Sequence, residues 1–234
     1  MKKVLRNIVL LCALPLTALP AIAADTVWNF DNPYNLNNRV GNYGSSYSTS
    51  VGDVSVNVFG WSYDSHDNKL VSSSLGVWSG SGMGSLNSEY DQHTIDNYGR
   101  SDFLLFSFSD AVNVSDIKLG YVARGYDSDV SVAAFDSLDS IDDSSWSSAI
   151  DSAIYSTSYN NVANVSPDLS SFGSAAKYWL IGAYNKVFGG DLDRHYDKFK
   201  LLALTTSTPK VDVPAPATAL LFGALGLLVL RRRK

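Results

Sequence analysis

The feature that most constrains the fold is a series of short strand-like segments, each separated from the next by residues that favour turns. In one segment, valines at positions 54, 56 and 58 alternate with other residues. This period of two is that of a strand with one buried face. Seven or eight such segments predict an all-β chain built as a single β-sandwich of the jelly-roll-like kind. The other expected strands are 26–30, 69–78, 103–108, 112–123, 129–135, 177–184 and 196–205.

The composition agrees with a chain that is rich in strands. Its acids are 22 Asp and a single Glu, and 34 of its residues are Ser. Asp, Ser, Asn and Gly are poor helix formers, so a short helix is expected only at 143–154, where Trp146, Ile150 and Ile154 share one face. The 13 Tyr, 10 Phe and 5 Trp supply apolar surface for a core, which favours a folded body over a disordered one.

The charge is distributed unevenly along the chain. Residues 1–6 hold three basic side chains and residues 231–234 hold four, while the interval between them carries 11 basic and 23 acidic residues. An acidic body of this kind repels the phosphate backbone, so nucleic acid is not expected as a partner.

The first 23 residues are typical of a secretory signal peptide. A positive start with Lys2, Lys3 and Arg6 precedes an apolar run, and a small-residue cleavage site follows at Ala21, Ala23 and Ala24. The Sec machinery and signal peptidase are therefore expected partners, and an uncleaved N-terminal anchor is the alternative. Cleavage would remove Cys12, the single cysteine, so the mature chain would have neither a disulfide nor a thiolate.

The C-terminal segment has three successive parts, which follow a β-sandwich domain expected at 24–204 and a linker at 205–212. Val213, Pro214, Ala215 and Pro216 come first, then an uncharged apolar stretch, and then a basic end with Arg231, Arg232, Arg233 and Lys234. A helix over about 214–230 would span about 26 Å, which is marginal for a hydrocarbon core of about 30 Å. The basic end favours the cytoplasmic side, so the body would lie outside the inner membrane. A permanent single-span anchor is the alternative interpretation.

This tail, residues 213–234, resembles the PEP-CTERM sorting signal of Gram-negative bacteria, in which a Pro-x-Pro motif precedes a short hydrophobic helix and an Arg cluster. The family's usual Glu between the prolines is replaced here by Ala215. The resemblance implies that an exosortase recognises and removes the tail. It also implies an inner-membrane precursor with a periplasmic domain, and a final location at the cell surface, in the outer membrane or in the extracellular matrix.

The body also resembles the exosortase-dependent surface protein family. The matching segments are LGVW at 75–78, EYDQHTIDN at 89–97, RSDFLLF at 100–106, DSDVS at 127–131, WLIGAY at 179–184 and DKFKL at 197–201. This resemblance implies an exported surface or matrix protein, associated with exopolysaccharide and biofilm, and it carries no enzymatic activity.

Carboxylates are dense between positions 89 and 102. Glu89, Asp91, Asp96 and Asp102 are candidate ligands for Ca²⁺, which takes six to eight oxygens. The alternative is a loop in which Asp96, Asn97 and Asp102 hold backbone amides and Arg100 pairs with a neighbouring acid. No cofactor other than a weakly bound Ca²⁺ is expected.

The tryptophans are candidate contacts for a glycan. Trp61 and Trp78, which lie beside Ser- and Gly-rich segments, are the candidates for stacking on sugar rings, whereas Trp179 is expected in the core. Core packing is the alternative for Trp61 and Trp78 as well. An enzyme is not expected, because the chain lacks a G-x-S-x-G motif and its three His have no metal-ligand spacing.

Overall fold

The computed structural model describes residues 25–64, 69–87, 93–138, 145–163, 169, 175–192 and 196–209. All of them belong to one compact unit, Ala23–Pro209. The predicted signal peptide and the sorting tail lie outside the described residues. Within the described part of the chain, no helix is both long and apolar enough to span a bilayer.

Strands make up most of the described chain, so the all-β prediction is confirmed. Short helical segments accompany them: η1 (Pro33–Asn35), α1 (Trp146–Ile150) and η3 (Lys186–Phe188). The strands are β1 (Asp25–Asn29), β2 (Leu36–Asn37), β3 (Tyr43–Gly44), β4 (Ser46–Val51), β5 (Val54–Asp64), β6 (Lys69–Trp78), β7 (Gly82–Leu86), β8 (Ile95–Asp96), β9 (Asp102–Val122), β10 (Val130–Phe135), β11 (Tyr155–Tyr159), β12 (Ala176–Ala183) and β13 (Lys198–Ser207).

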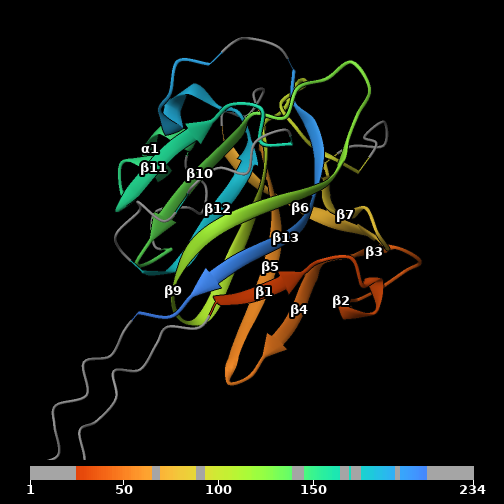
Figure 1. The fold of residues 1–234 in the computed structure, drawn as a ribbon. Coiled ribbons are helices and arrows are strands. Elements are labelled where there is room, and N and C mark those ends of the chain that lie inside the picture. Colours follow the sequence, from red (N-terminus) through yellow and green to blue (C-terminus); the bar gives the residue numbers. More distant parts are fainter. Residues whose placement is uncertain are drawn as a thin grey trace, which may run out of the picture. The chain divides into compact units, whose positions relative to one another are not determined.

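The sheet closes on itself as a five-stranded barrel. Its ring runs β9–β13–β7–β6–β5 and returns to β9 through a direct pairing of β5 with β9. Further strands extend from this ring, with β12, β10 and β11 beyond β9, and β4 and β2 beyond β5. Figure 1 shows β9 and β13 side by side with β1 along the other edge of β13.

This closed ring differs from the separate sheets expected of a jelly-roll-like sandwich, and the long strand β9 is the reason. Residues 102–108 of β9 pair with β5, whereas residues 113–122 pair with β13. The sequence predicted two strands, 103–108 and 112–123. The structure has a single bent strand, β9, which belongs to both parts of the sheet. The pairing of β9 with β13 contains several register shifts, which increase local bending and twist.

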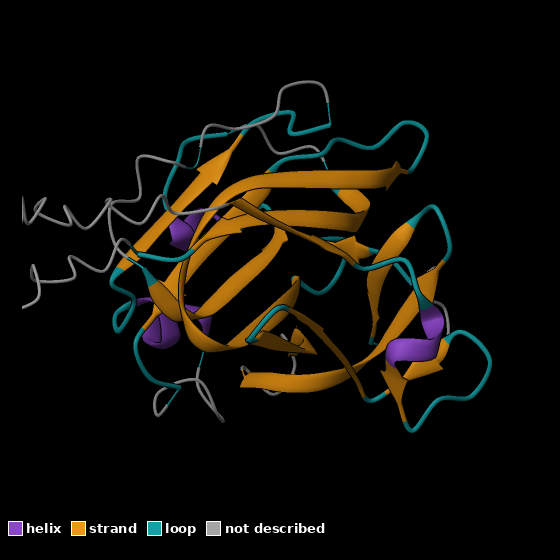
Figure 2. Ribbon diagram, turned by 60° about the horizontal axis from the view of Figure 1, so that its bottom comes forward, coloured by secondary structure: helices purple, strands orange, loops and turns teal. Residues whose placement is uncertain are grey.

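The apolar residues form two cores on opposite faces of the same strands. Leu104 and Phe106 of β9 join the main core inside the barrel, whereas Phe103 and Leu105 join a second core. Successive strand residues point to opposite faces, so the second core lies on the outside of the barrel, here called the outer face. Its members include Trp146 of α1 and Phe188 of η3, and Figure 2 shows how little helix accompanies the strands.

Other expectations from the sequence meet mixed outcomes. Trp179 is fully buried in the main core, as expected. The helix expected at 143–154 is shorter, because α1 covers only Trp146–Ile150. Residues 80–87 lie between two of the predicted strands, yet they contain strand β7.

Candidate functional site

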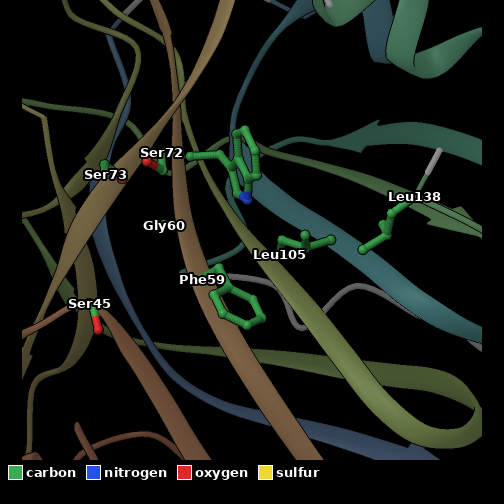
Figure 3. Close-up of a pocket in the computed structure, with 8 residues that line it drawn as sticks. Ser45, Phe59, Gly60, Ser72, Ser73, Leu105 and Leu138 are labelled. Atoms are coloured by element: carbon green, nitrogen blue, oxygen red, sulfur yellow. The ribbon is translucent and has the colours of Figure 1, made fainter. Parts of the chain in front are cut away.

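A pocket lies on the outer face at the margin of the second core. Its volume is about 260 Å³, and side chains or backbone of β5, β6 and β9 form much of its wall. Figure 3 shows Phe59, Leu105 and Leu138 around the same space. This outer-face pocket is lined by Ser45, Phe59, Gly60, Trp61, Ser72, Ser73, Leu105 and Leu138.

The alternation of β5 explains why aromatic residues line this pocket. Val56 and Val58 are fully buried in the main core. Phe59, the next residue along β5, points to the opposite face, where it is paired with Leu105 and is 38% exposed. Trp61 follows on the same face, opposite Ser72 of β6. Regular strand geometry therefore places two aromatic side chains next to each other on one face.

The indole N–H of Trp61 has an unusual environment. The Nε1 atom is buried and has no hydrogen-bond partner among the described residues. A buried donor left without an acceptor costs about 1–3 kcal/mol. Apolar walls with a few polar groups, here an indole N–H and serine hydroxyls, are the usual composition of a small-ligand site.

A row of polar side chains continues from the pocket across the outer face. The row occupies paired positions on four adjacent strands, so its members lie side by side. We call this row the outer-face ladder; its members are Ser48, Asn57, Ser107 and Tyr178. Ser48 Oγ donates to Asn57 Oδ1 at 2.7 Å, and Asn37 Nδ2 donates to Ser48 Oγ at 2.8 Å. These hydrogen bonds hold the polar groups in fixed positions.

Trp78, the other tryptophan suggested for glycan stacking, lies in a different environment. Its ring stacks on the imidazole of His93, with 5.2 Å between the ring centroids. Lys200 Nζ lies 3.9 Å from the ring centroid, and Tyr43 meets the ring edge-on. A Cβ atom at Gly76 would approach the indole to 2.5 Å. Groups of the protein itself thus occupy the Trp78 ring, so Trp61 remains as the candidate of the two tryptophans suggested for stacking.

The carboxylates suggested for Ca²⁺ are only partly described. Glu89 and Asp91 lie outside the described residues. Asp96 accepts hydrogen bonds from Thr94 Oγ1 and from the backbone N–H of Tyr98. Asp102 is fully buried and accepts a hydrogen bond from Asn87 Nδ2. Both described carboxylates therefore have hydrogen-bond partners within the protein.

A different group of carboxylates converges in the described part of the chain. Asp127, Asp129 and Asp197 place oxygen atoms within 4.8 Å of one another. Asp197 Oδ1 accepts from the backbone N–H of Asp129 at 2.7 Å, and its Oδ2 accepts from Asn97 Nδ2 at 2.7 Å. Three such carboxylates could contribute oxygen ligands to a hard cation such as Ca²⁺.

The environment of Asp197 changes its acidity. Burial raises the pKa of this carboxyl from 3.8 to about 7 because the charged form loses hydration. The backbone N–H of Asp129 opposes the rise by donating to the carboxylate, and the negative charges of Asp129 and Asp127 reinforce it. The sequence carried a signal for this cluster, since two of the segments compared above with a surface-protein family, 127–131 and 197–201, contain its members. Nothing in the sequence connected positions so far apart.

Comparisons with known protein families, with curated proteins and with solved structures found no match to this chain.

Proposed function

We propose that this chain is an exported, non-catalytic protein of the cell surface or extracellular matrix, and that its β domain binds carbohydrate. The export signal, the sorting tail and the motifs of the body support the first part of the proposal. The observation that carries the second part is the outer-face pocket, in which Phe59 and Trp61 lie beside serine hydroxyls.

The chemistry of a sugar suits this pocket. A pyranose ring has apolar C–H faces, which pack on aromatic rings, and hydroxyl groups, which exchange hydrogen bonds with Ser side chains and with an indole N–H. The two aromatic side chains come from one strand, so their relative positions are fixed by the sheet.

The proposal is tested by replacing one aromatic side chain at the pocket. Phe59→Ala should weaken retention of the full-length chain in native gels that contain a neutral polysaccharide, because the variant loses a packing surface of the site. A truncated anchor residue commonly costs about 1–3 kcal/mol of binding free energy, so the dissociation constant should rise by about 5- to 150-fold.

Tyr34→Ala provides the matched control, because Tyr34 is an aromatic residue that is 77% exposed and belongs to η1, away from the pocket lining. Equal retention of the two variants and the parent chain would contradict a carbohydrate site at the pocket.

An alternative to the proposed processing is permanent anchoring of the domain by a retained C-terminal span. The mass of the exported protein distinguishes the two, because only processing removes the tail.

A further inference from the structure

We infer that the binding surface extends beyond the pocket along the outer-face ladder and that it takes a neutral, linear polysaccharide through at least two adjacent sugar units. This inference rests on the proposed carbohydrate-binding role. It adds the extent of the site, the form of its ligand and the ligand's charge.

The dimensions of the sheet support an extended site. The ladder crosses β4, β5, β9 and β12, and three inter-strand spacings of about 4.8 Å give a length of about 14 Å. The row that contains Phe59 and Leu105 lies two residues further along the strands, a separation of about 7 Å. The pocket and the ladder are therefore neighbouring parts of one surface, which is longer than the pocket itself.

The ladder is suited to hydroxyl groups rather than to an apolar ligand. Asn57 is exposed and uses its carbonyl oxygen to accept from Ser48. Its amide nitrogen has no hydrogen-bond partner in the described part of the chain, so two N–H donors remain available to a ligand. Asn37 in turn fixes Ser48, so the polar groups are held in place before a ligand arrives, which lowers the entropy lost on binding.

Charge selects among polysaccharides. The side chains that line the pocket and form the ladder are all uncharged. Between its basic ends the chain carries 23 acidic residues against 11 basic ones, so an anionic polymer would be repelled. A neutral chain meets no such repulsion and loses no ionic hydration on binding.

The experiment separates the ladder from the pocket. The ladder variant combines Ser48→Ala with Asn57→Ala, and the pocket variant is Phe59→Ala. Asn160→Ala is the control, because Asn160 is an exposed asparagine that follows β11. Binding of the full-length chain is measured by titration calorimetry with gluco-, manno- and chito-oligosaccharides of one to six units. It is also measured by retention in gels that contain dextran, hydroxyethylcellulose, galactomannan or alginate.

We expect affinity to rise at least tenfold between one and four sugar units of the preferred series. The ladder variant should lose this gain while it keeps the affinity for the single sugar, because it lacks the hydrogen-bonding groups that the second and later sugar units would contact. The pocket variant should lose affinity at every length. Asn160→Ala should bind every ligand as the parent chain does. Gels that contain alginate should not retain the parent chain.

Other outcomes would overturn the inference in distinguishable ways. If affinity does not change with length, or the ladder variant behaves as the parent chain does, the site is confined to the pocket and only the inference fails. Retention by alginate as strong as by a neutral polymer would refute the assigned charge. If the parent chain binds no neutral polymer and no oligosaccharide, the inference and the proposed carbohydrate-binding role both fail. Unchanged melting temperatures of the variants exclude misfolding as the cause of a loss.

Discussion

At the scale of single residues, the ionisation of Asp197 is coupled to folding. Its pKa is raised to about 7 in the folded state, so between pH 4 and 7 the folded protein holds a proton that the unfolded chain has released. The stabilising contribution of that proton is complete below pH 3.8 and is lost as the pH rises through 7. Over this interval the loss is on the order of 4 kcal/mol, at 1.36 kcal/mol per pH unit of pKa difference.

Asp197→Asn should therefore flatten the dependence of the unfolding free energy on pH. The asparagine keeps an oxygen that can accept from the Asp129 N–H, and its amide does not ionise. Urea unfolding at pH 4.5, 6 and 8 measures the slopes. Asp53→Asn, in the exposed turn between β4 and β5, is the control and should keep the slope of the parent chain. Parallel curves for the Asp197 variant and the parent chain would disprove the assignment.

Removal of metal ions should leave the domain folded. The carboxylates of the Asp127 cluster already accept hydrogen bonds within the protein. Asp197 accepts from the Asp129 N–H and from Asn97, and Asp129 accepts from the Asn161 N–H. Their charge is therefore compensated in part without a cation. The buried apolar core of the barrel does not depend on the cluster. Far-ultraviolet circular dichroism in excess EDTA should match that in buffer alone. Cooperative unfolding on chelation would show that a metal is structural here.

At the scale of secondary-structure elements, alternation in the sequence predicted the strands that have regular pairing. The expected strand 69–78 coincides with β6, and those at 129–135 and 177–184 differ from β10 and β12 by a single residue at one or both ends. Strand β7 could not be predicted in this way, because its sequence GMGSL consists largely of residues that favour turns. In the structure these glycines allow neighbouring backbone segments to approach closely. A Cβ atom at Gly84 would lie 1.9 Å from the carbonyl oxygen of His93, a contact between segments that the sequence does not reveal.

Close packing of the same kind leads to a prediction for β12. A Cβ atom at Gly182 would meet the ring of Phe103 at 2.3 Å and the carbonyl oxygen of Asp102 at 2.4 Å. Gly182→Ala should therefore lower the unfolding free energy by about 1–3 kcal/mol, the usual cost of an overpacked core. For a domain of this size, thermal denaturation should show a melting temperature lower by roughly 2–10 °C.

Gly52→Asn is the control for this substitution. Gly52 has φ of 59° in the turn between β4 and β5, and its missing side chain would face open space. Asparagine tolerates this backbone conformation, so the melting temperature should change little. If the two variants melt at the same temperature, β12 and β9 are not as tightly packed as the structure indicates.

At the scale of the whole molecule, local sequence patterns indicated the class of the fold but not its closure. The ring closes because β9 changes partners along its length, and Ser109 and Asp110 are exposed where it leaves one part of the sheet for the other. In the sequence the same residues separated two predicted strands. The candidate site shows the same limit. Trp61 was identified from its neighbours in sequence, whereas Leu105 and the Asp127–Asp197 pair come together only through pairings between distant strands.

The two ends of the chain should determine which form of the protein is exported. A helix over the apolar run before the basic end would be barely long enough to span a bilayer, so we expect its insertion to be marginal compared with a span of about 20 residues. We expect Pro214 and Pro216 to favour an extended backbone at its outer side, the form that a processing enzyme would bind. Arg231, Arg232 and Arg233 should hold the other end in the cytoplasm.

We therefore expect the exported protein to begin at Ala24 or Asp25 and to lack the residues that follow the proline motif. Intact-mass analysis of the surface fraction, in strains with and without the exosortase, measures both ends at once. Replacement of the three arginines by glutamine should leave an unprocessed or misoriented precursor, because the charge that sets the orientation of the tail is removed. Replacement by lysine keeps that charge and should preserve the orientation. If both strains carry the full-length C-terminus in the inner membrane, the tail is a permanent anchor and the proposed processing is wrong, whereas carbohydrate binding by the β domain would stand or fall on its own test.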